Sequence, residues 1–268
     1  MRPLLNYMGG KWHHANWIIS NFPAHSIYVE PFGGGASVLL LKPRSKREVI
    51  NDVDDEIVNL YRVVRNRGKE LRQRLDMTPH SRTEYLYAHS NQAGKSSLER
   101  ARRTVVKSYF GIGDSVHNQN GFRSSKTSNT CVATSWRNWQ GHLDEIIERF
   151  RGVTIECLDY QDVIRKYDSP ETLFYMDPPY VWSTRDKSHS YAHEMTDADH
   201  KEFLEVVRGI KGMCLISGYN NPIYQESLGW RRVDQEYKTQ KATYKVESLW
   251  LCPKVERAGI QMNLGGAL

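Results

Sequence analysis

The sequence predicts an α/β fold in which a parallel sheet of about seven strands is interrupted by a helical insert. Short apolar runs of strand length alternate with helical patterns in residues 1–61 and again in residues 152–268. Between them, residues 62–151 show helical spacing without strand patterns. We therefore predict one sheet domain, formed by residues 1–61 and 152–268, that carries a helical insert at residues 62–151.

The first part of the sheet domain has the order strand, helix, strand, helix. Residues 26–30 have a strand pattern, and three glycines separate them from a helix that begins at Ala36. Residues 47–51 predict the second strand. A helix follows, with apolar positions at Ile57, Leu60, Tyr61 and Val64. This order is typical of strands that lie parallel in one sheet.

The insert is predicted to consist of helices and one long polar run. Helical spacing occurs in residues 69–75, 82–89, 97–110 and 136–150. The polar run, residues 114–135, contains an Asn-Gly pair, which is typical of a tight turn. We interpret this run as a hairpin or a functional loop, because it carries basic residues beside turn residues.

The second part of the sheet domain resumes the α/β pattern. Strands are predicted at residues 153–158, 172–176, 213–217 and 246–251. Residues 160–166 predict a short helix. Thr196 is the predicted N-cap of a longer helix that runs to Ile210, because acidic residues occupy its first turn.

Composition and charge place the chain among soluble globular proteins. Of 268 residues, 39% are hydrophobic and 25% are charged, and no apolar run reaches the length of a membrane span. The four cysteines lack metal-ligand spacing, and the N-terminal residues lack a signal-peptide pattern, so we expect a cytoplasmic protein without membrane contact. Neither these cysteines nor any other motif predicts a metal site.

The positive charge is concentrated in the insert. Residues 62–151 contain 17 Lys and Arg against 8 Asp and Glu, whereas the rest of the chain contains 20 against 23. This distribution indicates that the insert contacts a polyanion, although a solvated helical face is the simpler alternative. The candidate contacts, chiefly to nucleic-acid phosphates, are Arg100, Arg102, Arg103, Lys107, Arg123, Lys126 and Arg137.

Asp177, Pro178, Pro179 and Tyr180 stand where open α/β sheets bind their ligands. They follow the buried-strand pattern of residues 172–176 and open a polar loop. An aromatic exocyclic amine is a poor nucleophile because its lone pair is delocalised into the ring. Asp177 and the Pro178 carbonyl offer two acceptors for its protons, and Tyr180 offers a face on which a base that has left its helix can stack. A Pro-Pro turn with a capping Asp explains the prolines but not the whole set.

A glycine run and two acids follow other predicted strands at the same edge. Gly33, Gly34 and Gly35 allow a ligand to approach the backbone closely, but their spacing fits neither the dinucleotide fingerprint nor a P-loop. A tight structural turn explains the run equally well. Asp52, 17 residues after Gly35, suits an acid that binds ribose hydroxyls. Asp159 is either an acceptor for an exocyclic amine or a helix cap.

Four motifs occur in a fixed order along the chain: Tyr-Met-Gly-Gly-Lys at residues 7–11, Glu-Pro-Phe-Gly-Gly-Gly at residues 30–35, Asn51-Asp52, and Asp-Pro-Pro-Tyr at residues 177–180. Together they resemble the Dam-like DNA adenine N6-methyltransferases, the D12 or alpha group. Their exact residues are most similar to those of phage and prophage members. The resemblance covers most of the sheet domain; the insert matches only in position and helical character. It implies a Rossmann-like, S-adenosylmethionine-dependent methyltransferase sheet with a target-recognition insert, and double-stranded DNA as the partner.

The resemblance also implies roles for individual residues. The catalytic residues would be Asp177, Pro178, Pro179 and Tyr180. The implied contacts to S-adenosylmethionine are Tyr7, Lys11, Glu30, Phe32, Gly33, Gly34, Gly35, Asp52, Asp159 and Asp177, where Asp52 binds the ribose and Asp159 the adenine. Residues 188–195, with Tyr191 as a DNA contact, are similar to the family's mobile loop, and residues 215–217 to the strand that lines the base pocket. For Tyr7 and Lys11 the alternative is a structured N-terminal loop.

The target sequence and the partners are not predicted. Asn6 occupies the position at which bacterial Dam enzymes carry a DNA-contacting Lys, so the resemblance does not predict recognition of GATC. Oligomeric state and the presence of a cognate restriction enzyme stay open. Two other functions stay open as well: methylation of RNA adenine or of cytosine N4, although the cytosine enzymes usually carry Ser where Asp177 stands, and a DNA-binding protein with a catalytically dead methyltransferase fold.

Overall fold

The computed structural model describes most of the chain, and two units can be distinguished in it. The described residues are 1–7, 9–91, 93–113, 116–124, 131–184, 193–238 and 244–259. We call Met1–His13, Gly34–Leu41 and Asp54–Cys157 the helical unit, and His14–Gly33, Lys42–Val53 and Leu158–Leu268 the sheet unit. The helical unit contains the predicted insert and also takes in the N-terminal motif and two of the three glycines. Within the described ranges, no helix combines the length and apolar character of a membrane span.

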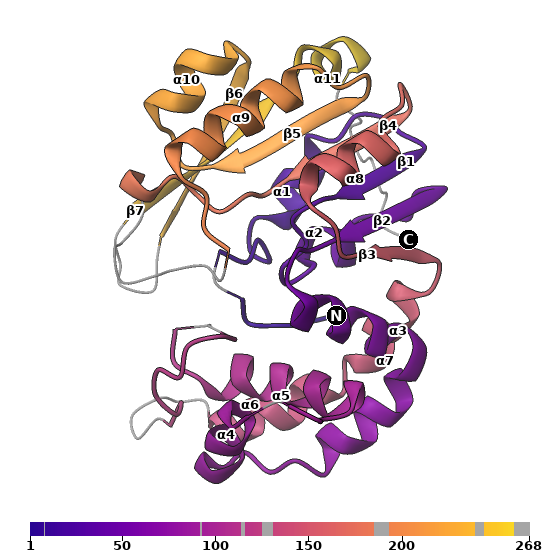
Figure 1. Ribbon diagram of the computed structural model, residues 1–268, viewed down its shortest axis with the longest axis vertical. Helices are drawn as coiled ribbons and strands as arrows, with labels where there is room; N and C mark the ends of the chain where they lie inside the picture. The colour runs from indigo at the N-terminus through magenta and orange to yellow at the C-terminus, as the bar shows by residue number, and fades with distance from the viewer. Residues whose placement is uncertain are drawn as a thin grey trace. The chain divides into compact units, whose positions relative to one another are not determined.

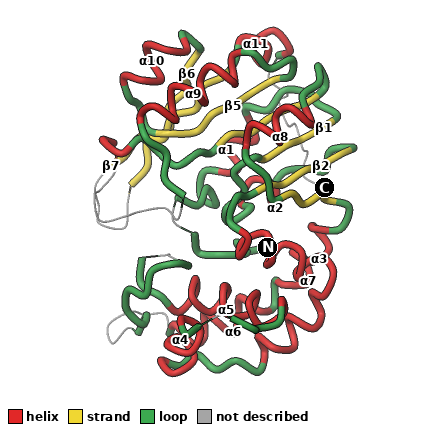
Figure 2. The backbone as a smooth tube through the Cα atoms, viewed as in Figure 1, coloured by secondary structure: helices red, strands yellow, loops and turns green. Residues whose placement is uncertain are grey.

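The sheet has seven strands in the order β3-β2-β1-β4-β5-β7-β6. The strands are β1 (Ile27–Glu30), β2 (Arg47–Asn51), β3 (Val153–Glu156), β4 (Thr172–Met176), β5 (Met213–Gly218), β6 (Arg231–Lys238) and β7 (Tyr244–Leu251). β1 pairs in parallel with β2 and β4, β4 pairs in parallel with β5, and β7 runs antiparallel to both β5 and β6. The strand order reverses between β1 and β4, which confirms the predicted Rossmann-like sheet (Figures 1 and 2).

The predicted strands are confirmed where their side chains are buried. β2 and β4 have the predicted bounds, and all five residues of β4 are buried between neighbours on both sides. β6 was missed by the sequence prediction. Its residues Arg231–Lys238 contain few apolar positions because it is an edge strand, whose exposed face favours polar side chains.

Helices cover both faces of the sheet in the sheet unit. After α1 (Ala15–Ser20), Phe22 lies 5.7 Å from the Tyr28 ring and 6.2 Å from the Tyr175 ring on one face. α8 (Tyr160–Tyr167), α9 (Asp197–Arg208) and α10 (Pro222–Leu228) follow the other face, where Tyr224 of α10 lies 5.0 Å from Trp250 of β7. α8 and α9 are drawn in front of the strands in Figure 1. The short α11 (Pro253–Ala258) packs on β5.

The start of α9 confirms the predicted cap. The Thr196 side chain accepts a hydrogen bond from the backbone of Asp199, and the Asp199 carboxylate accepts one from the backbone of Thr196, which together form a capping box. α9 ends at Arg208, two residues before the predicted end. Local sequence therefore determines where this helix begins, because the cap is formed by its own first turn.

The helical unit contains α2 (Ser37–Leu41), α3 (Asp55–Asp76), α4 (Arg82–His89), α5 (Ser97–Phe110), α6 (Val132–Gln140) and α7 (Leu143–Phe150). α4 and α5 have the predicted bounds. α3 joins two predicted helical stretches across Arg67, which has non-helical φ and ψ angles of −134° and 26°. At Gly68 a Cβ would lie 2.4 Å from Ile147, so glycine allows α3 and α7 to pack closely. The predicted helix of residues 136–150 is two helices, which meet at Gly141 and His142.

The described part of the predicted polar run supports a hairpin. Gly111 and Phe122 form an antiparallel bridge, and the Ile112 amide donates to the Gly121 carbonyl at 2.9 Å. The Asn120 side chain donates to the Ile112 carbonyl at 3.1 Å. We call residues 111–113 and 116–123 the hairpin segment. The predicted Asn-Gly pair lies in its second arm, where Gly121 pairs with Ile112, so the pair is not a two-residue turn.

Candidate active site

Asp177 directly follows β4, and its carboxylate is oriented by the neighbouring strand. The Ser217 hydroxyl on β5 donates to Asp177 Oδ1 at 2.7 Å and lies 3.0 Å from the Tyr175 hydroxyl. Both Tyr175 and Ser217 are buried. Burial, followed by the charge of Asp177, raises the pKa of Tyr175 well above its usual value, so its hydroxyl stays protonated. Residues 215–217 were expected to line the site, but the orienting hydrogen bond from Ser217 was not predicted.

Tyr180 is held at both its hydroxyl and its ring. Its side chain is only 6% exposed, and its hydroxyl donates to the carboxylate of Glu247 on β7. The ring lies edge-on to Tyr219, with centroids 4.9 Å apart and planes at 75°. The sequence predicted an aromatic face at this position and did not predict either contact. Stacking of a base on this ring stays a prediction.

Two of the predicted cofactor residues lie at the carboxyl end of β1. Glu30 is buried and accepts a hydrogen bond from the Tyr28 hydroxyl at 3.0 Å. The Phe32 ring stacks on Tyr160 of α8 at 5.5 Å and meets Phe203 of α9 edge-on at 5.9 Å. The Glu30 carboxylate and the Phe32 ring, two positions apart in the sequence, are thus both held in place. A binding site for a nucleoside needs such a polar group and such an apolar surface.

Asn51 joins the segments that carry three other predicted cofactor residues. Its carbonyl accepts from the Gly33 amide at 2.8 Å, and its side-chain amide donates to the carbonyls of Pro31 and Leu158 at 2.8 and 3.0 Å. Its side-chain oxygen accepts from the Leu158 amide at 2.8 Å. Asp52 and Asp159 are the next residues in the chain after Asn51 and Leu158. Asn51 is therefore a positioning residue that the sequence marked only as a neighbour of Asp52.

Asp159 is the N-cap of α8, because its carboxylate accepts a hydrogen bond from the Gln161 amide at 2.8 Å. The predicted capping role is therefore confirmed. A cap uses part of the carboxylate, so a contact to the cofactor adenine stays a prediction. Asp52 follows β2 and is partly buried, and its contact to a ribose likewise stays a prediction.

In the helical unit, the N-terminal motif packs against the glycines. Gly34 has a φ of +47°, and a Cβ there would lie 3.0 Å from the Tyr7 ring. A Cβ at Gly35 would lie 3.2 Å from Tyr7 Cβ. Tyr7 also accepts a hydrogen bond from the Gly10 amide at 2.8 Å, and buried Lys11 donates to the Gly9 carbonyl at 2.5 Å. Gly34 and Gly35 thus allow close packing against Tyr7, and Gly34 also has a left-handed backbone conformation that favours glycine. The contacts of Tyr7 and Lys11 to the cofactor stay predictions.

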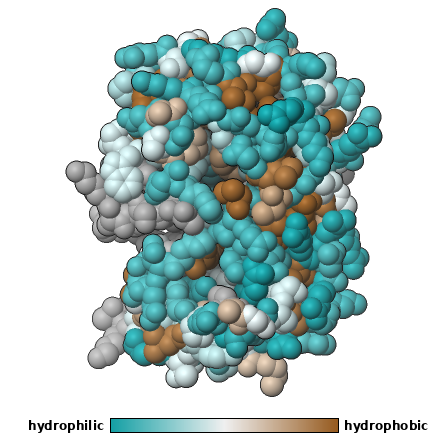
Figure 3. Space-filling view, viewed as in Figure 1, coloured by the Kyte–Doolittle hydropathy of each residue, from teal (hydrophilic) through white to brown (hydrophobic). Residues whose placement is uncertain are grey.

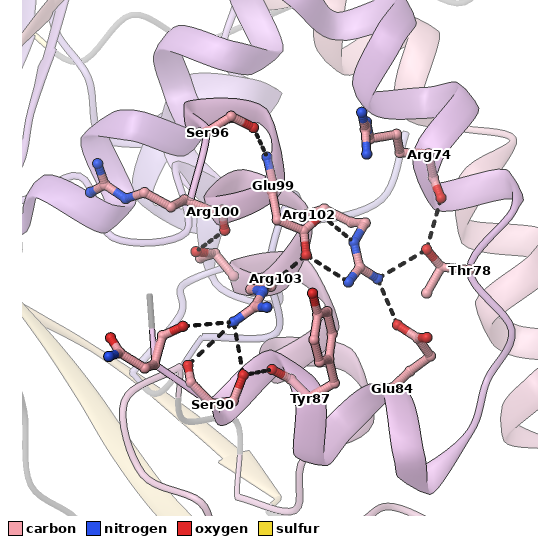
Figure 4. Close-up of polar contacts among 12 residues, drawn as sticks. Arg74, Thr78, Glu84, Tyr87, Ser90, Ser96, Glu99, Arg100, Arg102 and Arg103 are labelled. Atoms are coloured by element: carbon pink, nitrogen blue, oxygen red, sulfur yellow. Dashed lines mark hydrogen bonds and ion pairs between the residues drawn. The ribbon is translucent and has the colours of Figure 1, made fainter. Parts of the chain in front are cut away.

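Two predicted DNA contacts are corrected by the structure. Arg102 and Arg103 on α5 are 7% and 0% exposed. Arg102 donates to Glu84 at 2.8 Å and to Glu99 at 2.9 Å, and Arg103 donates to Glu99 at 2.9 Å (Figure 4). We call these four residues the Glu99 cluster. The guanidinium groups of Arg102 and Arg103 cannot reach a phosphate, because they are enclosed and the two glutamates balance their charge inside the helical unit.

The other predicted DNA contacts differ in how accessible they are. Arg137 on α6 is exposed. Arg100 forms ion pairs with Asp55 at 2.6 Å and Glu56 at 2.9 Å, and half-buried Lys107 has its pKa lowered by burial. Arg123 ends the hairpin segment and donates to the Gly111 carbonyl at 3.1 Å. Two further candidates, Lys126 and Tyr191, lie outside the described residues. Residues 188–192 of the predicted loop lie outside them as well.

Phe122 anchors the hairpin segment to the helical unit. Its ring lies 4.8 Å from the His80 ring and 6.3 Å from the Phe110 ring, and the guanidinium of Arg82 lies 5.0 Å above it. The sequence prediction did not include Phe122, although an aromatic residue directly after the Asn-Gly pair is a signal for such an anchor. The anchor limits where the predicted contact Arg123 can lie.

Two exposed apolar side chains lie beside predicted functional segments. The face drawn in Figure 3 is mainly hydrophilic, with apolar residues in small groups. Among exposed large apolar side chains, Ile112 of the hairpin segment is 54% exposed, and Trp182, two residues after Tyr180, is 46% exposed. Both adjoin predicted functional segments, and the sequence prediction had not marked either.

Comparison with known proteins identifies the family. The model of the family described as D12 class N6 adenine-specific DNA methyltransferase matches residues 7–244. The type II methyltransferase M.MjaIII of Methanocaldococcus jannaschii is 24% identical over 202 residues, 67% of this chain and 69% of that protein. The DNA adenine methylase of Escherichia coli K12 is 23% identical over 218 residues, 78% of this chain and 76% of that protein.

A solved rRNA methylase from Streptococcus thermophilus aligns with 94% of this chain and 98% of that one, at a TM-score of 0.36 and 10% identity, which is too distant a likeness to bear on function. The family model, by contrast, spans most of the sequence and includes the glycine run, Asn51-Asp52 and the Asp-Pro-Pro-Tyr motif. This chain therefore belongs to the D12 class N6 adenine-specific DNA methyltransferases.

Proposed function

We propose that the enzyme transfers a methyl group from S-adenosylmethionine to N6 of a single adenine that is rotated out of duplex DNA at a specific site. The observation that carries this proposal is the Asp177 carboxylate, which lies at the carboxyl end of β4 and is oriented by Ser217 at 2.7 Å. The family accounts for adenine and DNA; this geometry accounts for how the amine is made reactive.

Asp177 and the Pro178 carbonyl accept hydrogen bonds from the two N–H groups of the N6 amine. These hydrogen bonds draw the nitrogen toward tetrahedral geometry and localise its lone pair. The adjacent prolines lower the conformational cost of holding both acceptors in place. Positive charge develops on N6 as the methyl group arrives, and the negative charge of Asp177 stabilises it. Tyr180 supports the base by stacking.

The residues present fit S-adenosylmethionine by their chemistry. The carboxylates of Glu30 and Asp52 suit hydroxyl groups of a ribose, Phe32 suits a planar base, and Asp159 suits an exocyclic amine. When bound, the cofactor supplies an electrophilic methyl group on a sulfonium. Tyr7, Lys11, Gly34 and Gly35 of the helical unit are the further proposed contacts.

The proposed function is tested by transfer of tritium-labelled methyl groups from S-adenosylmethionine to unmethylated duplex DNA. We expect label in N6-methyladenine. No incorporation at any protein concentration would show a catalytically dead fold, and incorporation into RNA alone would show a different substrate. Sequencing of methylated bases in DNA from cells that express the protein would then give the target site.

Arg137→Ala is expected to weaken DNA binding uniformly across sequences, and to lower by about 1 the slope of log affinity against log salt concentration. The reason is that Arg137, an exposed residue of the helical unit, is proposed to contact one phosphate. Affinity for duplex DNA, measured at several NaCl concentrations, checks the prediction. Arg208→Ala on α9, where Arg208 pairs with Glu205, is the matched control. Equal slopes for both variants would remove Arg137 from the contact set.

A further inference from the structure

A buried carboxylate on β7 contacts the catalytic motif, although β6 and β7 contribute no residue to the predicted site. Glu247 is 3% exposed. It accepts a hydrogen bond from the hydroxyl of Tyr180. A carboxylate in the interior is unfavourable unless donors surround it, and an apolar residue of similar volume stabilises a core at least as well. Packing alone therefore does not explain why Glu247 faces Tyr180.

Tyr180 is also the end of a row of aromatic residues that reaches the antiparallel edge of the sheet. Its ring meets Tyr219 edge-on, and the Tyr219 hydroxyl lies 3.2 Å from the hydroxyl of Tyr237 on β6. Tyr237 in turn packs edge-on against His14 with ring centroids 4.4 Å apart. The ring of Tyr180 is thus restrained by the Tyr219 ring and, at its hydroxyl, by Glu247. Two restraints at different points of one ring determine the orientation of its plane.

In the hydrogen bond between Tyr180 and Glu247, the tyrosine stays the donor over the pH range in which the enzyme works. Burial and then the charge of Glu247 raise the pKa of Tyr180 well above its usual value. The Tyr180 hydroxyl therefore stays protonated and donates, while Glu247 accepts. The contact does not depend on which proton leaves the substrate.

We propose that Glu247 is a positioning residue, which holds the Tyr180 hydroxyl so that the ring stays in the plane on which the extruded adenine stacks. This inference rests on the proposed function. Glu247 itself does not touch the substrate in this proposal. It affects the rate of methyl transfer through Tyr180, which sets the position of the stacked adenine. A displacement of the reacting group by about 1 Å can lower the rate about 100-fold.

The test compares methyl transfer by Glu247→Leu, Glu247→Gln, Tyr180→Phe and the double variant Tyr180→Phe/Glu247→Leu. Glu247→Leu is expected to lower kcat between about 10- and 100-fold, with the KM for S-adenosylmethionine unchanged. Glu247→Gln is expected to retain more of the rate, because its amide oxygen still accepts the hydrogen bond. The double variant is expected to be no slower than the slower single variant, since both remove one contact.

Glu236→Gln on β6 is the matched control, because Glu236 is exposed on the neighbouring strand; its kcat is expected to equal that of the wild type. Wild-type kcat in Glu247→Leu would overturn the proposal. Losses that multiply in the double variant would overturn it as well, because they would show that the two residues act separately.

A second measurement separates this inference from the proposed function. In protein labelled with ¹³C at tyrosine Cζ, the Tyr180 signal is assigned by its absence in Tyr180→Phe. Its chemical shift is expected to change in Glu247→Leu and to stay constant in Glu236→Gln. An unchanged shift in Glu247→Leu overturns the inference whatever the enzyme methylates. If the wild-type protein methylates no DNA adenine while the Tyr180 shift changes in Glu247→Leu, the proposed function alone is overturned.

Discussion

Replacing Asp177 with alanine is expected to lower the rate of methyl transfer to adenine by about 1,000-fold. The variant loses the acceptor that draws the N6 amine toward tetrahedral geometry and the negative charge that stabilises the developing cation. Binding of S-adenosylmethionine is expected to be largely retained, because most of its proposed contacts lie on other strands and loops. Single-turnover transfer to duplex DNA and calorimetric titration with the cofactor measure the two effects separately.

Two further variants define what the Asp177 result means. Asp177→Asn keeps an oxygen that accepts the hydrogen bond from Ser217, so it is expected to be faster than Asp177→Ala and slower than the wild type. Asp162→Ala on α8, an exposed acid, serves as the control for a lost surface charge. Substantial transfer by Asp177→Ala would contradict the role proposed for this carboxylate.

Replacing Glu99 with alanine is expected to destabilise the helical unit by about 3 kcal/mol. Glu99 balances two guanidinium groups at once, and Arg103 is completely buried. Its removal leaves buried positive charge without its carboxylate. The loss falls at the lower end of the range for broken buried ion pairs, because Glu84 still pairs with Arg102. Urea unfolding followed by circular dichroism measures the change.

The control for Glu99 is an acid in an exposed pair of the same unit. Glu70→Ala removes the ion pair with Arg67 at 2.6 Å, and exposed pairs contribute little to stability, so its unfolding midpoint is expected to stay that of the wild type. Glu99→Gln keeps hydrogen-bond acceptor capacity without the charge and is expected to fall between wild type and alanine. An unchanged midpoint in Glu99→Ala would show that the Glu99 cluster does not stabilise the unit.

Much of the fold is predictable where local sequence carries the signal. β4 was predicted as a buried strand because it is a short and mostly apolar run, and α5 as a helix because its apolar positions recur with helical spacing. The cap at Thr196 depends only on the three residues that follow it. β6 has no such signal, since pairing with β7 alone makes it a strand.

The candidate site divides in the same way. The Asp-Pro-Pro-Tyr motif, the glycine run and Asp52 are recognisable along the chain because their residue types are rare in that order. Ser217 and Glu247 are not, since each acts on a residue 40 or more positions away. The same applies to Arg102 and Arg103, which count as positive charge in the composition until Glu84 and Glu99 enclose them.

The sequence by itself determined the class of fold, the order of six of the seven strands and the residues proposed to carry the chemistry, because these depend on side-chain type and spacing along the chain. Only the tertiary structure decided which groups orient them. Asn51 joins the loops that follow β1 and β3, Ser217 orients Asp177, and Glu247 holds Tyr180. The physical reason is that a hydrogen bond between distant segments depends on distances of a few tenths of an ångström, which arise only when the strands pair and pack.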